Sequence, residues 1–486
     1  MSERESANMR RTRGLGTWAV VLSVLAVVST ASLGADTVLD WNVIALRTTA
    51  AAPFNPPVES RNLAIVHAAM FDAVNSIIGD YHSYAVEFDP PKGASPEAAA
   101  AAAAHFVLVK LYSSQQATLD SAYAASLAGI PDGSGKSSGI RVGETVAEQV
   151  LALRADDGAE GAIVAPYTPG SRPGDWIPTP PAFHSALDPG WGTVRPFFLC
   201  EGSQFRPGPP PTLTSPQYTR DFNEIKEIGS LTSGTRTQQQ AELAHFWVST
   251  APQNWNPAAR QVVIAKVLTL SQNARLFALL NLAGADAFIA SWDAKFTYNQ
   301  WRPVTAIRAA DTDGNPNTIA DPAWTPLLVT PPFPDYIAGH TTYAGAAKEV
   351  LEATFGTNPR VTMALTSATA PGLVETYTTF EDIADGVVDA RVWGGIHWRT
   401  SSVRGKRVGE QIGRFAISHF LRHKAEHQGD QHLGKGATKS AYTHSEVSYV
   451  SRTSVQSRIR DNRTSDNPGV DSADCVWRRK FHCGSQ

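Results

Sequence analysis

The sequence has few of the features that mark several large classes of protein. It contains three cysteines in 486 residues, too few for a disulfide framework or a zinc cluster. Its formal net charge is only -3, which argues against bulk binding to nucleic acid. The hydrophobic content of 42% predicts a globular protein with a substantial core. Because the net charge is slightly negative, any anion site must be built locally, from a few cations gathered in one place.

Long apolar runs are also scarce, and the one near the N-terminus predicts an export signal. Several arginines precede an apolar run from Trp18 to Val28, and small residues follow as far as Ala35. The alternative is a membrane anchor, but the run is shorter than the ~20 residues that span a bilayer. We expect residues 1–35 to be a cleaved signal, the protein to be secreted or periplasmic, and the mature chain to have no further membrane span.

The alternation of polar and apolar residues that marks strands is not sustained anywhere, whereas helical spacing recurs along the chain. Helices are predicted within 62–77, 96–111, 118–127, 142–153, 238–248, 257–301, 343–351 and 412–420. Proline and glycine dominate residues 166–216, which predicts a long irregular segment. The predicted fold is all-α, with two packed halves that each resemble a four-helix bundle and long Pro/Gly-rich loops. This helical domain is assigned to residues 36–426, followed by a polar tail, 427–486, that we expect to be disordered.

Three segments carry cations and histidines at spacings that indicate an anion site. The first contains Lys295 and Arg302, which lie on nearly the same face if one helix continues through both. The second reaches His340 through a glycine beside a predicted helix start, where free backbone N–H groups attract anions. The third contains Arg391 and His397, separated in part by two glycines that allow the backbone to bend.

Each of these features has an ordinary explanation when it is taken alone. A lysine and an arginine on one helix face are usually solvated, and a histidine among apolar residues is often a satisfied core residue. Together they form a recurrent combination, because arginine binds an oxyanion bidentately, lysine adds a point charge and a neutral histidine nitrogen binds the central atom. The three segments therefore predict a site for a tetrahedral oxyanion.

The order Lys, six residues, Arg-Pro, then Gly-His, then Arg, five residues, His resembles a pattern that two groups of enzymes share. These are the acid phosphatases of the lipid-phosphatase type and the vanadium-dependent haloperoxidases. Trp292, Phe333 and the run Gly395–Trp398 resemble the chloroperoxidase branch, and the similarity covers roughly residues 40–421. The resemblance implies one vanadate per chain as cofactor. It also implies oxidation of a halide by hydrogen peroxide to hypohalous acid, which then reacts with an organic acceptor.

The resemblance also implies a role for each residue of the pattern. His397 would be the protein ligand of vanadium and a catalytic residue, and His340 would be the catalytic general acid–base. Trp292 and Phe333 would shape the halide side of the site. The groups that would bind the cofactor are Lys295, Arg302, the Gly339 backbone N–H, Arg391 and His397.

Two positions depart from the pattern. The family has serine where this chain has Ala338, so a hydroxyl that would donate to a cofactor oxygen is missing. A hydrogen bond to a charged group contributes about 1.5–3 kcal/mol, so vanadate affinity is expected to fall roughly ten- to a hundredfold. The related phosphatases have aspartate where this chain has Ser401, so another group must orient His397.

Three functions are compatible with this reading of the sequence. The leading one is a vanadate-dependent haloperoxidase that uses hydrogen peroxide and a halide. The second is a secreted acid phosphatase with the same pocket, in which His397 would be the nucleophile. The third is a non-catalytic protein that binds phosphate or vanadate. The sequence leaves the halide, the organic acceptor and the oligomeric state open.

Overall fold

A computed structural model describes residues 36–53 and 55–424 of the chain. The predicted signal, 1–35, and the predicted tail, 427–486, lie outside the described residues. The described part is built from helices and one two-stranded sheet, which confirms the all-α prediction. Cys200 is disulfide-bonded, and the other two cysteines lie outside the described residues.

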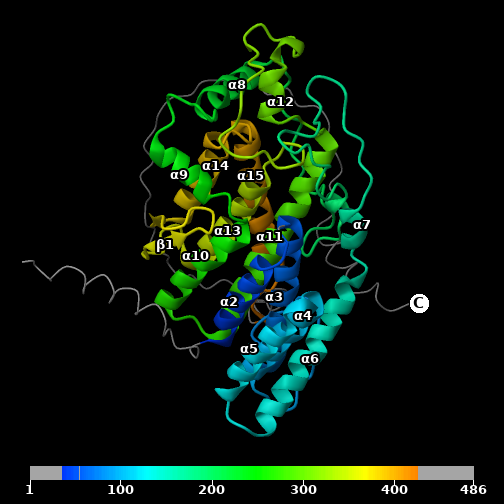
Figure 1. The fold of residues 1–486 in the computed structure, drawn as a ribbon. Coiled ribbons are helices and arrows are strands. Elements are labelled where there is room, and N and C mark those ends of the chain that lie inside the picture. The colour runs from blue at the N-terminus through cyan, green and yellow to red at the C-terminus, as the bar shows by residue number, and fades with distance from the viewer. Residues whose placement is uncertain (1–35, 54, 425–486) are drawn as a thin grey trace, which may run out of the picture.

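The N-terminal helices form one bundle, which lies in the lower half of Figure 1. It consists of α2 (Thr37–Ala50), α3 (Pro56–Ile78), α4 (Pro96–Leu111), the short η1 (Ser113–Gln115), α5 (Gln116–Ala128) and α6 (Ser134–Ala155). Asn55 and Ser95 cap α3 and α4 with their side chains, and a proline occupies the first turn of each helix. The helices predicted over 62–77, 96–111, 118–127 and 142–153 are therefore confirmed, with α3 and α6 longer than expected.

The segment predicted to be irregular is so in the structure. Between α7 (Ala159–Ile163) and α8 (Pro216–Ile228), the described chain contains one short 3-10 turn, η2 (Trp191–Thr193). This turn packs against α11, which belongs to the second bundle. The long segment therefore covers part of α11, one of the helices of the second bundle.

The second bundle supplies the candidate site. Its elements are α9 (Gln238–Phe246), α10 (Ala251–Lys266), α11 (Leu270–Tyr298), α12 (Pro303–Arg308), η3 (Ala310–Thr312), α13 (Gly339–Phe355), α14 (Phe380–Trp393) and α15 (Arg399–His419). Strands β1 (Met363–Thr366) and β2 (Val374–Tyr377) pair antiparallel, with Met363 opposite Tyr377. Helix α11 packs against α3 as well as α13, so the two bundles share a continuous apolar core (Figure 1).

The helix predicted over 257–301 is two helices in the structure. Val267 adopts a left-handed conformation that ends α10, and Thr269 with Gln272 forms a capping box that begins α11. Helix α11 is long and apolar enough to cross a membrane by composition, which the sequence analysis did not anticipate. However, 94% of its most apolar window is buried inside the fold, as expected for a central helix covered on every side.

Candidate active site

Lys295 and Arg302 meet, but not as two residues on one helix face. Helix α11 ends at Tyr298, because Asn299 adopts a left-handed conformation, and Arg302 is the extended residue that precedes α12. The turn between the two helices is held in place by the irregular segment, whose Trp176 donates its backbone N–H to the carbonyl of Asn299 at 2.7 Å. The prediction of proximity is thus confirmed, while the helical reason for it was wrong.

Lys295 is a fully buried cation whose partners are carbonyl oxygens. Its Nζ donates to the backbone oxygens of Pro334 at 3.0 Å and Asp335 at 2.8 Å. It also lies 4.9 Å from the centre of the Phe333 ring. Burial, and after it the charge of Arg302, holds the pKa of Lys295 well below its usual range. A nearby anion would restore the charged form.

Arg302 is also completely buried and makes a similar set of contacts. Its Nε donates to the carbonyl of Phe333 at 2.7 Å, and its Nη1 donates to the carbonyl of Ile396 at 2.6 Å. Its Nη2 is buried without a hydrogen-bond partner. Burial lowers the pKa of this guanidinium to about 10. One donor of the fork is therefore available to a ligand.

Arg391 completes the group of cations from the last turn of α14. Its Nη2 donates to the carbonyl of Trp247, whereas its Nε is buried and has no partner. Burial, followed by the charge of Arg302, lowers its pKa to about 9. His340, in the first turn of α13, is partly exposed, and its Nε2 lies 3.3 Å from the Ser249 carbonyl. Burial and then Arg391 lower the pKa of His340 to about 3, so this imidazole is neutral at ordinary pH.

The start of α13 presents backbone rather than side-chain donors. Ala338 precedes the helix and offers no side-chain cap, whereas the hydroxyls of Thr341 and Thr342 both donate to its carbonyl. A side chain at Gly339 would meet the rings of Phe288 and Trp292 at 3.2 Å. Any larger residue would therefore press on these two rings at the close approach between the helix start and α11.

His397 lies on the short bend between α14 and α15 and is almost completely buried. Gly395, with φ +74°, makes this bend. The Nδ1 of His397 lies 3.1 Å from Oδ2 of Asp335, and its Nε2 lies 3.1 Å from Nη1 of Arg302. Burial, followed by the charge of Arg302, keeps the pKa of His397 well below its ordinary value. The imidazole is thus neutral and placed among the cations.

Asp335 was missed by the sequence analysis. It is fully buried two residues after Phe333, and its carboxylate is the acidic group that acts on both Lys295 and Arg302. Its burial raises its pKa to about 6, while Arg302 and Lys295 act to lower it. The available signal was an acidic residue in an otherwise apolar loop. Ser401, the position where an orienting group was sought, instead donates to the backbone oxygen of Asp335 at 3.2 Å.

Trp292 and Phe333 form an aromatic wall beside the cations. Their ring centres are 4.8 Å apart, and Phe333 also lies 4.7 Å from the guanidinium carbon of Arg302. The indole N–H of Trp292 donates to the carbonyl of Leu187 at 3.2 Å, which fixes the ring. The site therefore has one cationic side and one apolar side.

The charge balance of the cluster matches an oxyanion. With Lys295, Arg302 and Arg391 protonated and Asp335 ionised, the cluster has three positive charges and one negative charge, which leaves two positive charges in a buried place. Unpartnered guanidinium nitrogens of Arg302 and Arg391 add free donors. Buried charges are stable only when they are paired, so the residues fit a singly or doubly charged tetrahedral anion such as vanadate or phosphate.

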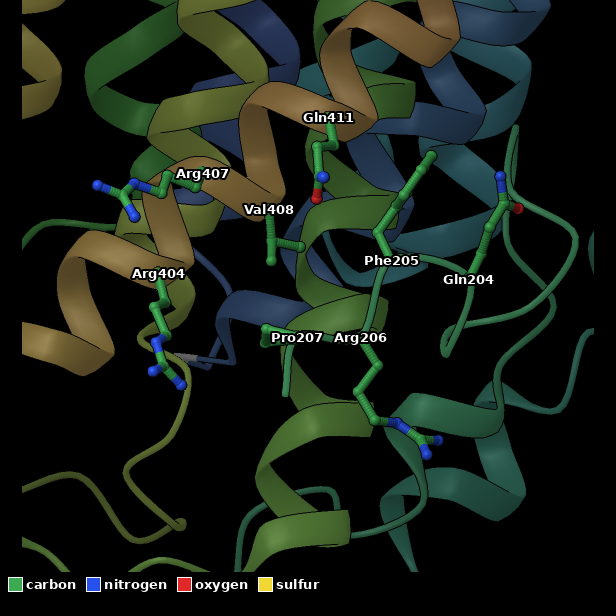
Figure 2. A pocket seen from close by; sticks show the side chains of 8 residues that line it. All are labelled: Gln204, Phe205, Arg206, Pro207, Arg404, Arg407, Val408 and Gln411. Atoms are coloured by element: carbon green, nitrogen blue, oxygen red, sulfur yellow. The ribbon is translucent and has the colours of Figure 1, made fainter. Parts of the chain in front are cut away.

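A separate surface pocket lies near this site but contains none of the predicted site residues. Figure 2 shows its lining, which consists of Gln204, Phe205, Arg206, Pro207, Arg404, Arg407, Val408 and Gln411. Two of its arginines already have partners, since Arg206 pairs with Asp293 and Arg404 donates to the hydroxyl of Tyr336 at 2.8 Å. Arg404 therefore fastens the loop that carries Asp335 to α15 from the outer side.

The fold and the site together define a helical-bundle protein with a buried cationic cluster around His397. Residues 275–426 match the family model of the VCPO second helical-bundle domain. These residues run from α11 to beyond α15 and carry every residue of the cluster. The resemblance of the chain to vanadium-dependent haloperoxidases is therefore confirmed.

Individual relatives agree with this assignment. A vanadium chloroperoxidase from Curvularia inaequalis is 27% identical over 399 residues, which are 65% of this chain and 64% of that protein. The chain thus matches slightly less than two thirds of that relative's length. The crystal structure of the first bacterial vanadium-dependent iodoperoxidase matches at 27% identity, with a TM-score of 0.68 over 80% of this chain and 96% of that one. A holo-type bacterial vanadium-dependent chloroperoxidase shares the fold at 19% identity, with a TM-score of 0.62 over 75% of this chain and 91% of its own.

Proposed function

We propose that this protein is a vanadate-dependent haloperoxidase. The observation that carries the proposal is the neutral His397, held with its Nε2 beside Arg302 inside a buried cluster of net positive charge. A neutral imidazole nitrogen can bind a metal centre, and the surrounding cations can neutralise its oxygens. The iodoperoxidase and chloroperoxidases that share the fold are in accord with this chemistry.

The proposed reaction is the oxidation of a halide by hydrogen peroxide. Halide, hydrogen peroxide and one proton give hypohalous acid and water, so the halide loses two electrons and the peroxide O–O bond accepts them. Vanadate, when bound, supplies a Lewis acid that activates peroxide without changing its own oxidation state. The organic acceptor would then react with the hypohalous acid.

The protein's own residues would contribute charge, orientation and proton transfer. Lys295, Arg302 and Arg391 would hold the oxyanion, together with the backbone N–H of Gly339. His340 is neutral and stands in the first turn of α13, so it can accept the proton that peroxide loses and return it to the leaving oxygen. The apolar wall of Trp292 and Phe333 would receive the halide, a weakly hydrated anion, beside Lys295.

The first test is a comparison of the mature chain, from about residue 36, with a His397→Ala variant. Both proteins are loaded with orthovanadate, and bromination of a phenolic dye is followed with peroxide and bromide. We expect vanadate-dependent colour change in the wild type and its loss in the variant. His245→Ala, which changes an exposed histidine on α9, should retain the activity. Halogenation that persists in His397→Ala would refute the role given to His397.

An acid phosphatase is the second candidate, because the contact between His397 and Asp335 is also suited to a histidine nucleophile. The aromatic wall counts against it, since Trp292 and Phe333 leave little room for a large ester. Release of phosphate from a small aryl phosphate, measured without vanadate, tests this candidate directly. Hydrolysis in the wild type that is lost in His397→Ala would favour the phosphatase.

A further inference from the structure

The loop that carries Asp335 is fixed on several sides. The backbone N–H of Asp335 donates to the carbonyl of Gln300 at 2.9 Å, and its own carbonyl accepts from Lys295 and Ser401. The neighbouring Tyr336 hydroxyl donates to the carbonyl of Gly208 at 2.7 Å. These hydrogen bonds fix the backbone at Asp335, and the fixed backbone in turn sets the position of its carboxylate.

The Asp335 carboxylate lacks a well-placed hydrogen-bond donor. Both of its oxygens are buried and have no partner of good hydrogen-bond geometry among the described residues, although the Ser401 hydroxyl and the Trp398 backbone N–H lie close enough to lower the pKa of the carboxyl. The nearest ring nitrogen is Nδ1 of His397 at 3.1 Å from Oδ2, whereas Nη1 of Arg302 is 4.0 Å away. A protonated Nδ1 is thus the best-placed donor for a group that is costly to leave unpaired.

The Nε2 side of the His397 ring faces a hydrogen-bond donor instead of an acceptor. The Nε2 of His397 faces Nη1 of Arg302 at 3.1 Å, and a guanidinium can only donate hydrogen bonds. Nη1 also lies 3.4 Å from Nδ1, but the contact with Nε2 is the shorter one and favours a lone pair on Nε2, while an ionised carboxylate at Nδ1 can only accept. The neutral tautomer with its proton on Nδ1 satisfies both neighbours, whereas the other tautomer leaves Asp335 without this donor and can accept from Arg302 only over the longer distance.

We propose that Asp335 is a positioning residue that keeps the proton of His397 on Nδ1, so that the Nε2 lone pair is directed into the oxyanion cluster. This inference rests on the proposed function, because it assigns Nε2 as the nitrogen that binds vanadium. It supplies the orienting group that Ser401 does not provide. Outer hydrogen-bond partners of this kind typically change metal affinity by about 10–100-fold.

A purely electrostatic role for Asp335 makes a different prediction. Removing its negative charge would leave three positive charges instead of two, so every oxyanion would bind more tightly. The positioning role predicts weaker binding only for an anion that needs the nitrogen lone pair. Orthovanadate accepts a fifth ligand, whereas sulfate does not, so the two anions separate the two roles.

The test uses Asp335→Asn, which keeps the size of the side chain but allows an amide N–H to face Nδ1 and favour the wrong tautomer. We expect about a 10–100-fold loss of orthovanadate affinity by calorimetry, with sulfate bound as tightly as before or more tightly. Asp313→Asn is the matched control, since Asp313 is a buried carboxylate that bonds to Asn315 and Thr318 in a loop outside the cluster. It should change neither affinity. Tighter binding of both anions by Asp335→Asn, or parallel weakening of both with a lower melting temperature, would overturn the proposal.

A second readout needs no vanadate and no turnover. Long-range ¹⁵N–¹H spectra of the histidine-labelled protein report which ring nitrogen carries the proton, with His397 assigned by the signal lost in His397→Gln. We expect the proton on Nδ1 in the wild type and on Nε2 in Asp335→Asn. A wild-type His397 protonated on Nε2 would overturn the inference. Absence of halogenation with the expected tautomer would instead count against the proposed function alone.

Discussion

The side chain at position 338 is one methyl group, where the pattern that this sequence resembles has serine. Ala338 is buried directly before α13 and gives this helix no side-chain cap. Ala338→Ser should add a donor beside the oxyanion cluster and an N-cap for the helix. We expect vanadate affinity to rise roughly tenfold or more, and the free energy of unfolding without ligand to rise by about 1 kcal/mol.

Calorimetry with orthovanadate and urea unfolding of the same samples measure these two effects separately. Thr354→Ser, at the far end of α13, is a suitable control because Thr354 already bonds to the carbonyl of Val350 and lies away from the cluster. Unchanged vanadate affinity in Ala338→Ser would show that the backbone N–H groups already satisfy the oxyanion.

At the scale of single residues, the sequence predicted some members of the cluster and missed another. The pattern of cations and histidines predicted a cluster around Lys295, Arg302 and His397, and the structure brings these residues together. The pattern did not include Asp335, because a lone acidic residue in a loop is usually solvated. Only the fold shows that this loop turns its acid inward against His397.

At the scale of helices, the site depends on how closely α13 approaches α15. Gly345 and Gly409 lie at their crossing, where an added Cβ would meet the Lys406 carbonyl at 2.0 Å and the Thr342 carbonyl at 1.9 Å. Gly345→Ala should force these helices apart and lower the free energy of unfolding by about 1–3 kcal/mol. Because His340 stands at the start of α13, vanadate affinity should fall as well.

Denaturant unfolding measures the first effect, and a matched glycine provides the control. Gly161 lies in α7 with no atom within 4 Å of an added Cβ. Gly161→Ala should therefore be neutral or stabilising, by at most about 1 kcal/mol, because alanine favours a helix. Equal unfolding free energies for Gly345→Ala and the wild type would mean that the crossing is not constrained at this point.

Element boundaries were the part of the fold that the sequence predicted least well. The periodic helices over 96–111 and 238–248 were found nearly as expected. The break at Val267 and the turn after Tyr298 were missed. Val267 and Asn299 adopt left-handed conformations, and neither is a glycine, which is the residue that usually indicates such a conformation in a sequence. Helix α14 was missed although it has 14 residues, and the β1–β2 hairpin was missed because its strands have only four residues each.

At the scale of the whole molecule, a buried polar network joins the two bundles. Asn42 of α2 lies 3.0 Å from Nε2 of His67 on α3 and donates to Asn256 of α10 at 2.8 Å. Asn256 in turn bonds to Asn281 of α11 at 3.1 Å. Because these amides connect helices from both halves, the network ties the stability of the N-terminal bundle to that of the bundle that carries the site.

His67 makes this connection sensitive to acid. Its burial, and after it the charge of Arg260, lowers its pKa to about 3 from the ordinary value of 6.5. The unfolded chain therefore binds a proton below pH 6.5 while the folded chain does not, and stability is lost progressively as the pH falls from 6.5 to 3. At pH 4.5, two units below 6.5, this loss amounts to about 3 kcal/mol.

The variant His67→Gln keeps an amide in the network but cannot be protonated. Buried carboxyls such as Asp72, whose pKa is raised to about 6, act in the opposite direction, but they are common to both proteins and cancel in the comparison. Urea unfolding at pH 7 and pH 4.5 should therefore show the wild type losing about 3 kcal/mol more than the variant between the two values. If both proteins lose the same amount, then His67 is protonated in the folded state, and the network must open to water at mildly acidic pH.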